Sequence, residues 1–297
     1  FIENRLRDWC GSAFSSIFDY EINKNYIITK DKNNNDVIQP IDYSNTGTVQ
    51  QNSVWSGLHQ FLQIKHGLRL TEENLNSCFL SNLIFFKLYK NIYGFTGTLG
   101  SIKTQEAIKE IYNIELIEIP TFKRSQFKRL NNYNYNEKKI FELSLLREVE
   151  SIVIKNNRAV LLIFEYISDA EEFFKKYSNL FKTINLYIRN DIEEEKEFLN
   201  KPIEPRTVII STNLAGRGTD IKISEKLEKN GGLHVILTFM PANKRIEEQA
   251  FGRAARKGEK GSGQIIMFSN DSYENILKLQ NLEEEDNFNY LIYYYKE

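Results

Sequence analysis

The segment Thr207-Val-Ile-Ile-Ser-Thr-Asn-Leu-Ala-Gly-Arg-Gly-Thr-Asp-Ile221 decides the fold. It begins with a run of β-branched residues, which predicts a buried strand, and then breaks at an arginine between two glycines. Because glycine accepts a positive φ and lets a neighbour approach closely, we expect a tight loop after the strand. Asp220 then follows the carboxyl end of that strand, where open α/β sheets place their ligands.

Strands and helices alternate on both sides of this segment, a pattern typical of a parallel sheet with helices on both faces. We therefore predict an α/β fold over residues 108–270. Helices are expected at 137–156 and 245–257. Strands are expected at 116–119, 159–164, 184–188, 207–211, 233–238 and 264–268.

The first third of the chain predicts a smaller α+β part. Residues 1–20 are typical of the end of a helix, and Tyr26–Lys30 and Val37–Asp42 are typical of two short strands around a polar turn. Two more helices are expected at 53–66 and 82–93. A chain of 297 residues is long enough for about two domains.

A second motif, Gln249-Ala-Phe-Gly-Arg-Ala-Ala-Arg-Lys-Gly258, has the spacing Q-x-x-G-R-x-x-R. On the helix expected at 245–257, Arg253 and Arg256 would project from one face because they are three residues apart. ATP hydrolysis spreads negative charge over the γ-phosphoryl oxygens, and an arginine inserted there is worth about 10³–10⁵ in rate. By spacing alone, a solvated basic helix face is an equal alternative.

Together these motifs resemble the two nucleotide-sensing motifs of the second RecA-like domain of superfamily-two helicase ATPases. The motif sequences are most similar to those of SecA, the ATPase motor of preprotein translocation, which has T-N-M-A-G-R-G-T-D-I and Q-L-R-G-R-S-G-R-Q-G at these places. Upstream, Trp55-Ser-Gly-Leu-His-Gln60 resembles that family's W-S-D-G-L-H-Q, and Tyr93-Gly-Phe-Thr-Gly-Thr98 resembles its G-M-T-G-T. The resemblance extends from about Tyr26 to Phe268.

The resemblance implies a RecA-like sheet of the P-loop NTPase type. It implies that residues 1–50 end a preprotein-binding-like insert, that 51–105 complete a first nucleotide-binding lobe, and that 106–297 form the second RecA-like lobe. Its motifs assign catalysis to Arg253 and Arg256. They assign nucleotide contact to Gly216, Arg217, Gly218, Asp220, Gln249 and Gly252, and coupling between lobes to Thr96, Gly97 and Thr98.

We expect Arg253 and Arg256 to face the same cleft as Gly216 and Asp220, at the carboxyl edge of the sheet. His59 is interpreted as a structural histidine. The chain departs from the family's pattern at Phe251, where the family has arginine, and at Ala255, where it has glycine. It also lacks the family's aspartate after Ser56, and Thr238-Phe-Met-Pro241 replaces T-E-R-H.

The sequence contains no G-x-x-x-x-G-K-[ST] loop and no D-E-A-D-like carboxylate pair. The first would hold the β- and γ-phosphates, and the second would bind Mg²⁺. The implied cofactor is therefore Mg-ATP, with phosphate and metal ligands on a lobe outside this chain. We expect the chain alone to be inactive as an ATPase, and we predict no metal site within it.

Composition limits the classes of partner and compartment that the chain would suit. The net charge of −1 gives no overall field for nucleic acid, and the two cysteines fit a reducing compartment. No apolar run approaches the roughly 18 residues of a membrane span. The sequence starts at Phe1 without an initiating Met, and its first residues do not resemble a signal peptide. We expect a piece of a longer protein that is cytoplasmic or peripheral at a membrane.

Three functions remain open. The first is a SecA-like motor that acts on polypeptide, with the other RecA-like lobe and a membrane translocation channel as partners. The second is a nucleic-acid helicase lobe, which the near-neutral charge disfavours. The third is a scaffold that keeps the fold without catalysis, which Phe251 and Ala255 would suit. The transported or remodelled substrate is not readable from the sequence.

Overall fold

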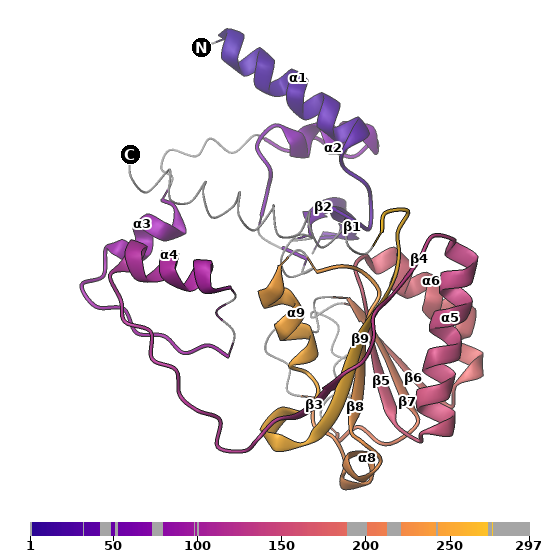
Figure 1. Cartoon of the computed structure of the whole chain (residues 1–297). Helices are drawn as coiled ribbons and strands as arrows, with labels where there is room; N and C mark the ends of the chain where they lie inside the picture. Colours follow the sequence, from indigo (N-terminus) through magenta and orange to yellow (C-terminus); the bar gives the residue numbers. More distant parts are fainter. Residues whose placement is uncertain are drawn as a thin grey trace.

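The computed structural model describes residues 2–31, 33–41, 49–50, 53–72, 80–97, 99, 101–188, 201–212, 221–241, 243–272 and 275. A large sheet with helices on both faces forms the body of the molecule, and the N-terminal elements stand above one edge of it (Figure 1). The helices α3 and α4 lie to one side of that body.

The strands are β1 (Tyr26–Lys30), β2 (Asp36–Pro40), β3 (Gln126–Arg129), β4 (Tyr133–Tyr135), β5 (Ala159–Phe164), β6 (Thr183–Tyr187), β7 (Thr207–Thr212), β8 (Leu233–Leu237) and β9 (Lys260–Phe268). The helices are α1 (Ile2–Phe18), α2 (Leu58–Lys65), α3 (Asn82–Lys87), α4 (Ile102–Tyr112), α5 (Lys138–Glu150), α6 (Ile167–Tyr177), α8 (Glu225–Lys229) and α9 (Lys244–Phe251). Short helical segments are η1 (Ser151–Lys155), η2 (Ser178–Leu180) and η5 (Arg256–Gly258).

The main sheet has seven strands in the order β3-β9-β8-β5-β7-β6, and β4 also pairs with β9. Every neighbouring pair in it is parallel. The central strands β5, β7 and β8 are buried along their whole length, because helices cover both of their faces. This confirms the predicted α/β class and its parallel sheet.

Two cores lie on opposite faces of the sheet. On one face, Leu145 of α5 and Phe173 of α6 pack against alternate residues of β5 and β7. On the other face, Leu227 of α8 and Phe251 of α9 pack against the intervening residues. Figure 1 shows α5 and α6 on one side of the sheet and α9 on the other. The alternation follows from the two-residue period of a strand.

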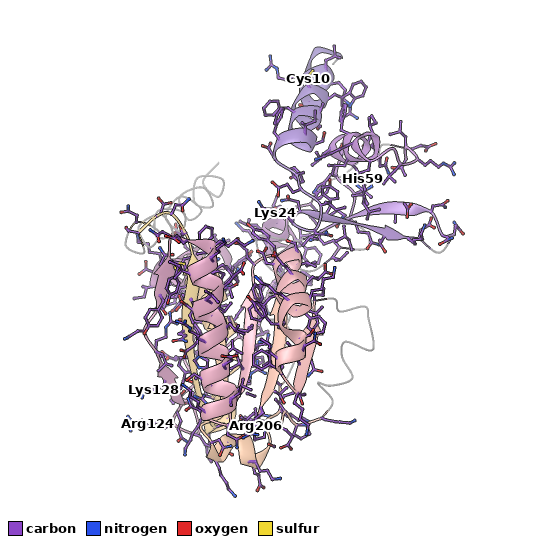
Figure 2. The ribbon with its side chains drawn as sticks, turned by 90° about the vertical axis from the view of Figure 1, so that its right-hand side faces the viewer. Cys10, Lys24, His59, Arg124, Lys128 and Arg206 are labelled. Atoms are coloured by element: carbon purple, nitrogen blue, oxygen red, sulfur yellow. The ribbon has the colours of Figure 1, made fainter. Side chains whose placement is uncertain are left out.

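The two short strands predicted near the N-terminus are β1 and β2, and they pair as an antiparallel hairpin. Tyr26 and Ile38 of the hairpin form a small core with Leu58 and Leu62 of α2. Ile27, by contrast, belongs to the large core beneath α5 and α6. The hairpin is therefore joined to the main sheet by apolar packing, and Lys24 lies at that junction (Figure 2).

Some sequence expectations were wrong. Residues 116–119 form no strand, and Ile117 and Ile119 are 82% and 74% exposed. The strands β3 and β4 were not predicted. The helix expected at 245–257 ends at Phe251, and those expected at 53–66 and 82–93 are shorter, at α2 and α3.

Candidate functional site

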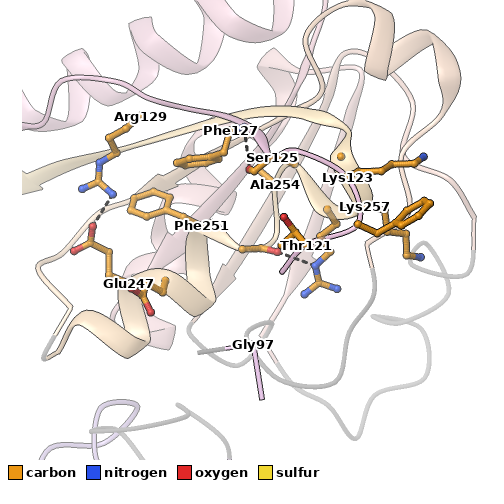
Figure 3. Close-up of a pocket in the computed structure, with 16 residues that line it drawn as sticks. Gly97, Thr121, Lys123, Ser125, Phe127, Arg129, Glu247, Phe251, Ala254 and Lys257 are labelled. Atoms are coloured by element: carbon orange, nitrogen blue, oxygen red, sulfur yellow. Dashed lines mark hydrogen bonds and ion pairs between the residues drawn. The ribbon is translucent and has the colours of Figure 1, made fainter. Parts of the chain in front are cut away.

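A groove of about 920 Å³ runs between the chain that leads into β3, the helix α9 and the turn that follows α9 (Figure 3). It is lined by Gly97, Thr121, Phe122, Lys123, Ser125, Phe127, Arg129, Glu247, Glu248, Phe251, Gly252, Ala254, Ala255, Arg256, Lys257 and Gly258. Seven of the ten residues of the second sequence motif therefore line one groove with Gly97 of the T-G-T segment.

The last turn of α9 sets the position of Arg256. Asn243 begins the helix by accepting a hydrogen bond from the backbone N–H of Ile246 at 3.0 Å. At the other end, the N–H of Gly252 donates to the carbonyl of Glu248 at 2.8 Å. The Nε of Arg256 then donates to the carbonyl of Gly252 at 2.7 Å. This bond ties the guanidinium across the end of the helix.

The two arginines of the motif do not share a helix face, which corrects the sequence expectation. The helix stops before them, and Ala255, Lys257 and Gly258 have φ values of 57°, 56° and 82°. These left-handed residues turn the chain into β9. Arg253 is consequently buried, with 3% of its surface exposed, whereas Arg256 lines the groove.

The expectation that the motif arginines lie at the carboxyl edge of the sheet was also wrong. The helix α9 carries the chain from the end of β8 to the start of β9, so it runs against the direction of these parallel strands. The residues that follow α9 lie just before Lys260, the first residue of β9. Arg256 is therefore at the amino end of the sheet and not at its carboxyl end.

The structure brings together Gly97, Gly252 and Arg256 of the predicted site residues. Gln249 and Arg253 do not line this groove, and Thr96 is exposed. The predicted residues Gly216, Arg217, Gly218, Asp220 and Thr98 lie outside the described residues.

Sequence reasoning missed the other cations of the groove. Lys123 and Arg129 come from the segment Lys123-Arg-Ser-Gln-Phe-Lys-Arg129, whose density of basic residues was the available signal. Arg129 lies over Phe251, the residue that replaces the family's arginine, with its guanidinium carbon 4.2 Å from the ring centre. Its Nη1 also donates to Glu247 Oε1 at 2.6 Å.

The charge of the groove suits a polyphosphate. Lys123, Arg129, Arg256 and Lys257 line it, against the two carboxylates of Glu247 and Glu248. Guanidinium groups stay charged and offer forked donors that match phosphate oxygens. The groove therefore offers charged donors of the kind that bind phosphate oxygens. Among the described residues there is no cluster of three or more His, Cys, Asp or Glu side chains that could hold a metal ion.

The buried histidines have structural surroundings. His234 Nδ1 is 2.8 Å from Ser262 Oγ, which also accepts a hydrogen bond from Arg158 Nη2 at 2.8 Å. Burial, and then the Arg158 charge, lowers the pKa of His234 to about 3, so the ring is neutral. Burial likewise lowers the pKa of His59 in α2.

In the part of the chain that the structure describes, every helix is too short or too polar to cross a bilayer.

The chain is similar to known proteins over most of its length. The helicase conserved C-terminal domain family matches residues 143–258. The protein translocase subunit SecA of Helicobacter hepaticus is 30% identical over 268 residues, which is 88% of this chain and 31% of that protein. The protein translocase subunit SecA 2 of Nitrosospira multiformis is 31% identical over 258 residues, which is 85% of this chain and 37% of that protein.

Among solved structures, S. cerevisiae Dbp5 bound to RNA and ADP BeF3 superposes with a TM-score of 0.41 and 20% identity, over 62% of this chain and 46% of that one. The family match and the parallel sheet define a RecA-like lobe of the helicase C-terminal type. That lobe is SecA-like, since SecA relatives align with most of the chain. The chain spans about a third of the length of these relatives.

Proposed function

We propose that this chain supplies the arginine side of an ATP site shared between two lobes of a SecA-like motor. The observation that carries the proposal is Arg256, which is tied to the Gly252 carbonyl and lies in a basic groove that Gly97 also lines. Mg-ATP would bring a triphosphate, whose phosphate-binding loop and metal ligands lie on the other lobe.

Four residues of the groove have distinct parts in this proposal. Arg256 places a permanently charged guanidinium where charge grows on the γ-phosphoryl oxygens. Lys123 and Lys257 add positive charge that draws the phosphates in. Gly252 has no room for a side chain, because a Cβ there would lie 2.8 Å from the Glu248 carbonyl oxygen.

The remaining predicted residues keep their proposed roles on the strength of the sequence motifs. Gln249 and Arg253 would support the nucleotide contact from the end of α9. Gly216, Arg217, Gly218 and Asp220 would contact the ribose and phosphates. Thr96, Gly97 and Thr98 would couple the lobes, and the fact that Gly97 lines the same groove as Arg256 supports that assignment.

A partner lobe would also account for the apolar surface near α3. Phe85 and Phe86 are 40% and 44% exposed, and Tyr93 and Phe95 in the segment that follows are 88% and 97% exposed. Apolar patches of this kind mark interaction surfaces. We propose that residues 51–105 complete a first nucleotide-binding lobe, that 1–50 end a preprotein-binding-like insert, and that 106–297 form the second lobe.

The work of the motor is proposed to be ATP-driven movement or remodelling of a polypeptide. The relatives are named as protein translocase subunits, which favours a polypeptide substrate and a membrane channel as partner, with the protein in the cytoplasm or at the membrane surface. A nucleic-acid helicase lobe is the second candidate, and the net charge of −1 disfavours it. A scaffold without catalysis is the third.

The test is a nuclear magnetic resonance titration of the isotope-labelled chain with MgATP. We expect weak, millimolar binding that perturbs Gly97 and residues 252–258, and no hydrolysis, because the phosphate loop is absent from the sequence. Arg256→Ala should weaken binding, whereas Lys128→Ala, which removes a positive charge from a residue that does not line the groove, should not. Perturbation elsewhere, or hydrolysis at a motor's rate, would refute the proposal.

A further inference from the structure

We propose that the edge strand β3 positions the arginine loop, defined as residues 252–258, and that Arg129 is its positioning residue. The effect on ATP rests on the proposed function, whereas the positioning itself does not. The sequence motifs give no role to β3. The structure places this strand against both ends of the arginine loop (Figure 3).

The first contact holds α9, from Glu247 in its first turn to Phe251 at its end, just before the loop. Arg129 Nη1 donates to Glu247 Oε1 at 2.6 Å, and the two side chains are only 35% and 25% exposed. The same guanidinium lies 4.2 Å from the centre of the Phe251 ring. A partly desolvated ion pair combined with a cation–π contact holds its partners more firmly than a surface pair does.

Phe251 in turn has little freedom to move. Its ring centre is 5.7 Å from that of Phe127 on β3, and the residue is 6% exposed. A Cβ at Gly263 of β9 would lie 2.3 Å from Phe251 Cδ1. The ring therefore packs on the face of the sheet against Phe127 of β3 and Gly263 of β9, with Arg129 over it, and Gly252 follows directly in the chain.

The second contact holds the far end of the loop. Gln126 Nε2 donates to the carbonyl of Gly258 at 2.6 Å. From that point β3 pairs in parallel with β9, from Gln126 opposite Lys260 to Arg129 opposite Gly263. Arg256 lies between these two points of attachment.

The arginine loop requires such support. Ala255 and Lys257 adopt the left-handed conformation without being glycine. Residues held in this region persist only where the surrounding structure over-determines them. The bond from Arg256 Nε to the Gly252 carbonyl survives only while that turn keeps its shape. We infer that loss of Arg129 loosens α9 at Phe251 and releases the Arg256 side chain.

The experiment compares Arg129→Ala with Lys128→Ala in the full chain. Both variants remove one positive charge from β3, but neighbouring strand residues point to opposite faces, and Lys128 does not line the groove. The nucleotide-free readout is hydrogen exchange of the Arg256 Nε–H group, followed by nuclear magnetic resonance. We expect Arg129→Ala to speed that exchange by about fivefold, the factor that corresponds to roughly 1 kcal/mol of lost contact. Lys128→Ala should match wild type.

Two further variants make the result decisive. Arg129→Lys keeps the ion pair but loses the planar contact with Phe251, so it should restore part of the protection. If Arg129→Ala fails to fold, Glu247→Gln removes the ion pair alone and takes its place. Unchanged Arg256 exchange in a folded variant that lacks the ion pair would overturn the positioning role, whatever ATP does.

The same samples are then titrated with MgATP. Weaker binding in Arg129→Ala, by about fivefold, extends the positioning role to the nucleotide. If ATP fails to perturb Arg256 even in wild type, the proposed function fails, and the exchange result from the nucleotide-free samples still decides the role of Arg129.

Discussion

A methyl group added at Gly263 would collide with the ring of Phe251. In Gly263→Ala the new Cβ would lie 2.3 and 2.6 Å from Phe251 Cδ1 and Cε1, and 3.0 Å from Phe127 Cζ. Ordinary van der Waals contact begins at 3.4 Å, so the Phe251 ring must retreat by about 1 Å. Strand β9 lies in the interior of the sheet, between β3 and β8, so the strand has little room to move instead.

The expected cost follows from overpacking. Forcing extra volume into a packed core costs about 1–3 kcal/mol of unfolding free energy, and we expect the upper half of that range because two aromatic rings are affected. Gly94→Ala is the control, since no atom lies within 4 Å of its added Cβ. Adding Phe251→Leu to Gly263→Ala should recover part of the loss, because the smaller side chain leaves room for the methyl group.

Urea unfolding, followed by circular dichroism, measures these changes. If Gly263→Ala stays within about 0.5 kcal/mol of wild type, the ring is not wedged as described, and the argument for a rigid end of α9 fails. An additive double mutant would lead to the same conclusion, because it would mean that the methyl group and the ring do not meet.

Two other predictions concern stability. Ala255→Gly should raise the unfolding free energy by about 0.5 kcal/mol, because the relief of left-handed strain at φ 57° outweighs the conformational entropy that glycine adds to the unfolded chain. Urea unfolding midpoints check this prediction, and a loss of stability would contradict it. His234 has a pKa lowered from 6.5 to about 3, so the unfolded chain binds a proton that the folded chain does not, and stability falls as pH drops below 6.5. His234→Gln should reduce the slope of unfolding free energy against pH by up to about 1.4 kcal/mol per pH unit. Urea unfolding at several pH values measures this slope, and equal slopes in the variant and the wild type would refute the prediction.

The sequence predicted the centre of the sheet well because burial on both faces leaves an unambiguous signal. The runs Ala159–Phe164, Thr207–Thr212 and Leu233–Leu237 are almost wholly apolar or β-branched, and each forms a strand that is buried throughout. The edge strand β3 has the sequence Gln126-Phe-Lys-Arg, which shows no such run. Its strand conformation depends on pairing with β9, a partner more than a hundred residues away.

The opposite error occurred at residues 116–119. The sequence Leu116-Ile-Glu-Ile119 favours a strand by composition, but it pairs with no strand of the described chain. Strand propensity expresses how well a residue fits a half-buried surface, so it predicts nothing where that surface is missing.

The candidate site was partly predictable. The spacing of Gln249 to Gly258 located the arginine loop, whereas the place of Gly97 in the same groove was not predicted. The shape of the loop was not predictable, because two consecutive alanines favour continued helix, whereas Ala255 adopts a left-handed conformation. Arg129 was missed because its role depends on tertiary contacts with Glu247 and Phe251.

The central claim is that Arg256 acts on the transition state of ATP hydrolysis. The direct measurement joins this chain to a first lobe that carries a G-x-x-x-x-G-K-[ST] loop and compares the ATP hydrolysis rates of wild type and Arg256→Ala. We predict that Arg256→Ala lowers the rate by about 10³-fold or more and changes ATP affinity less, because the guanidinium stabilises charge that develops mainly in the transition state. Hydrolysis at the wild-type rate by Arg256→Ala would contradict it.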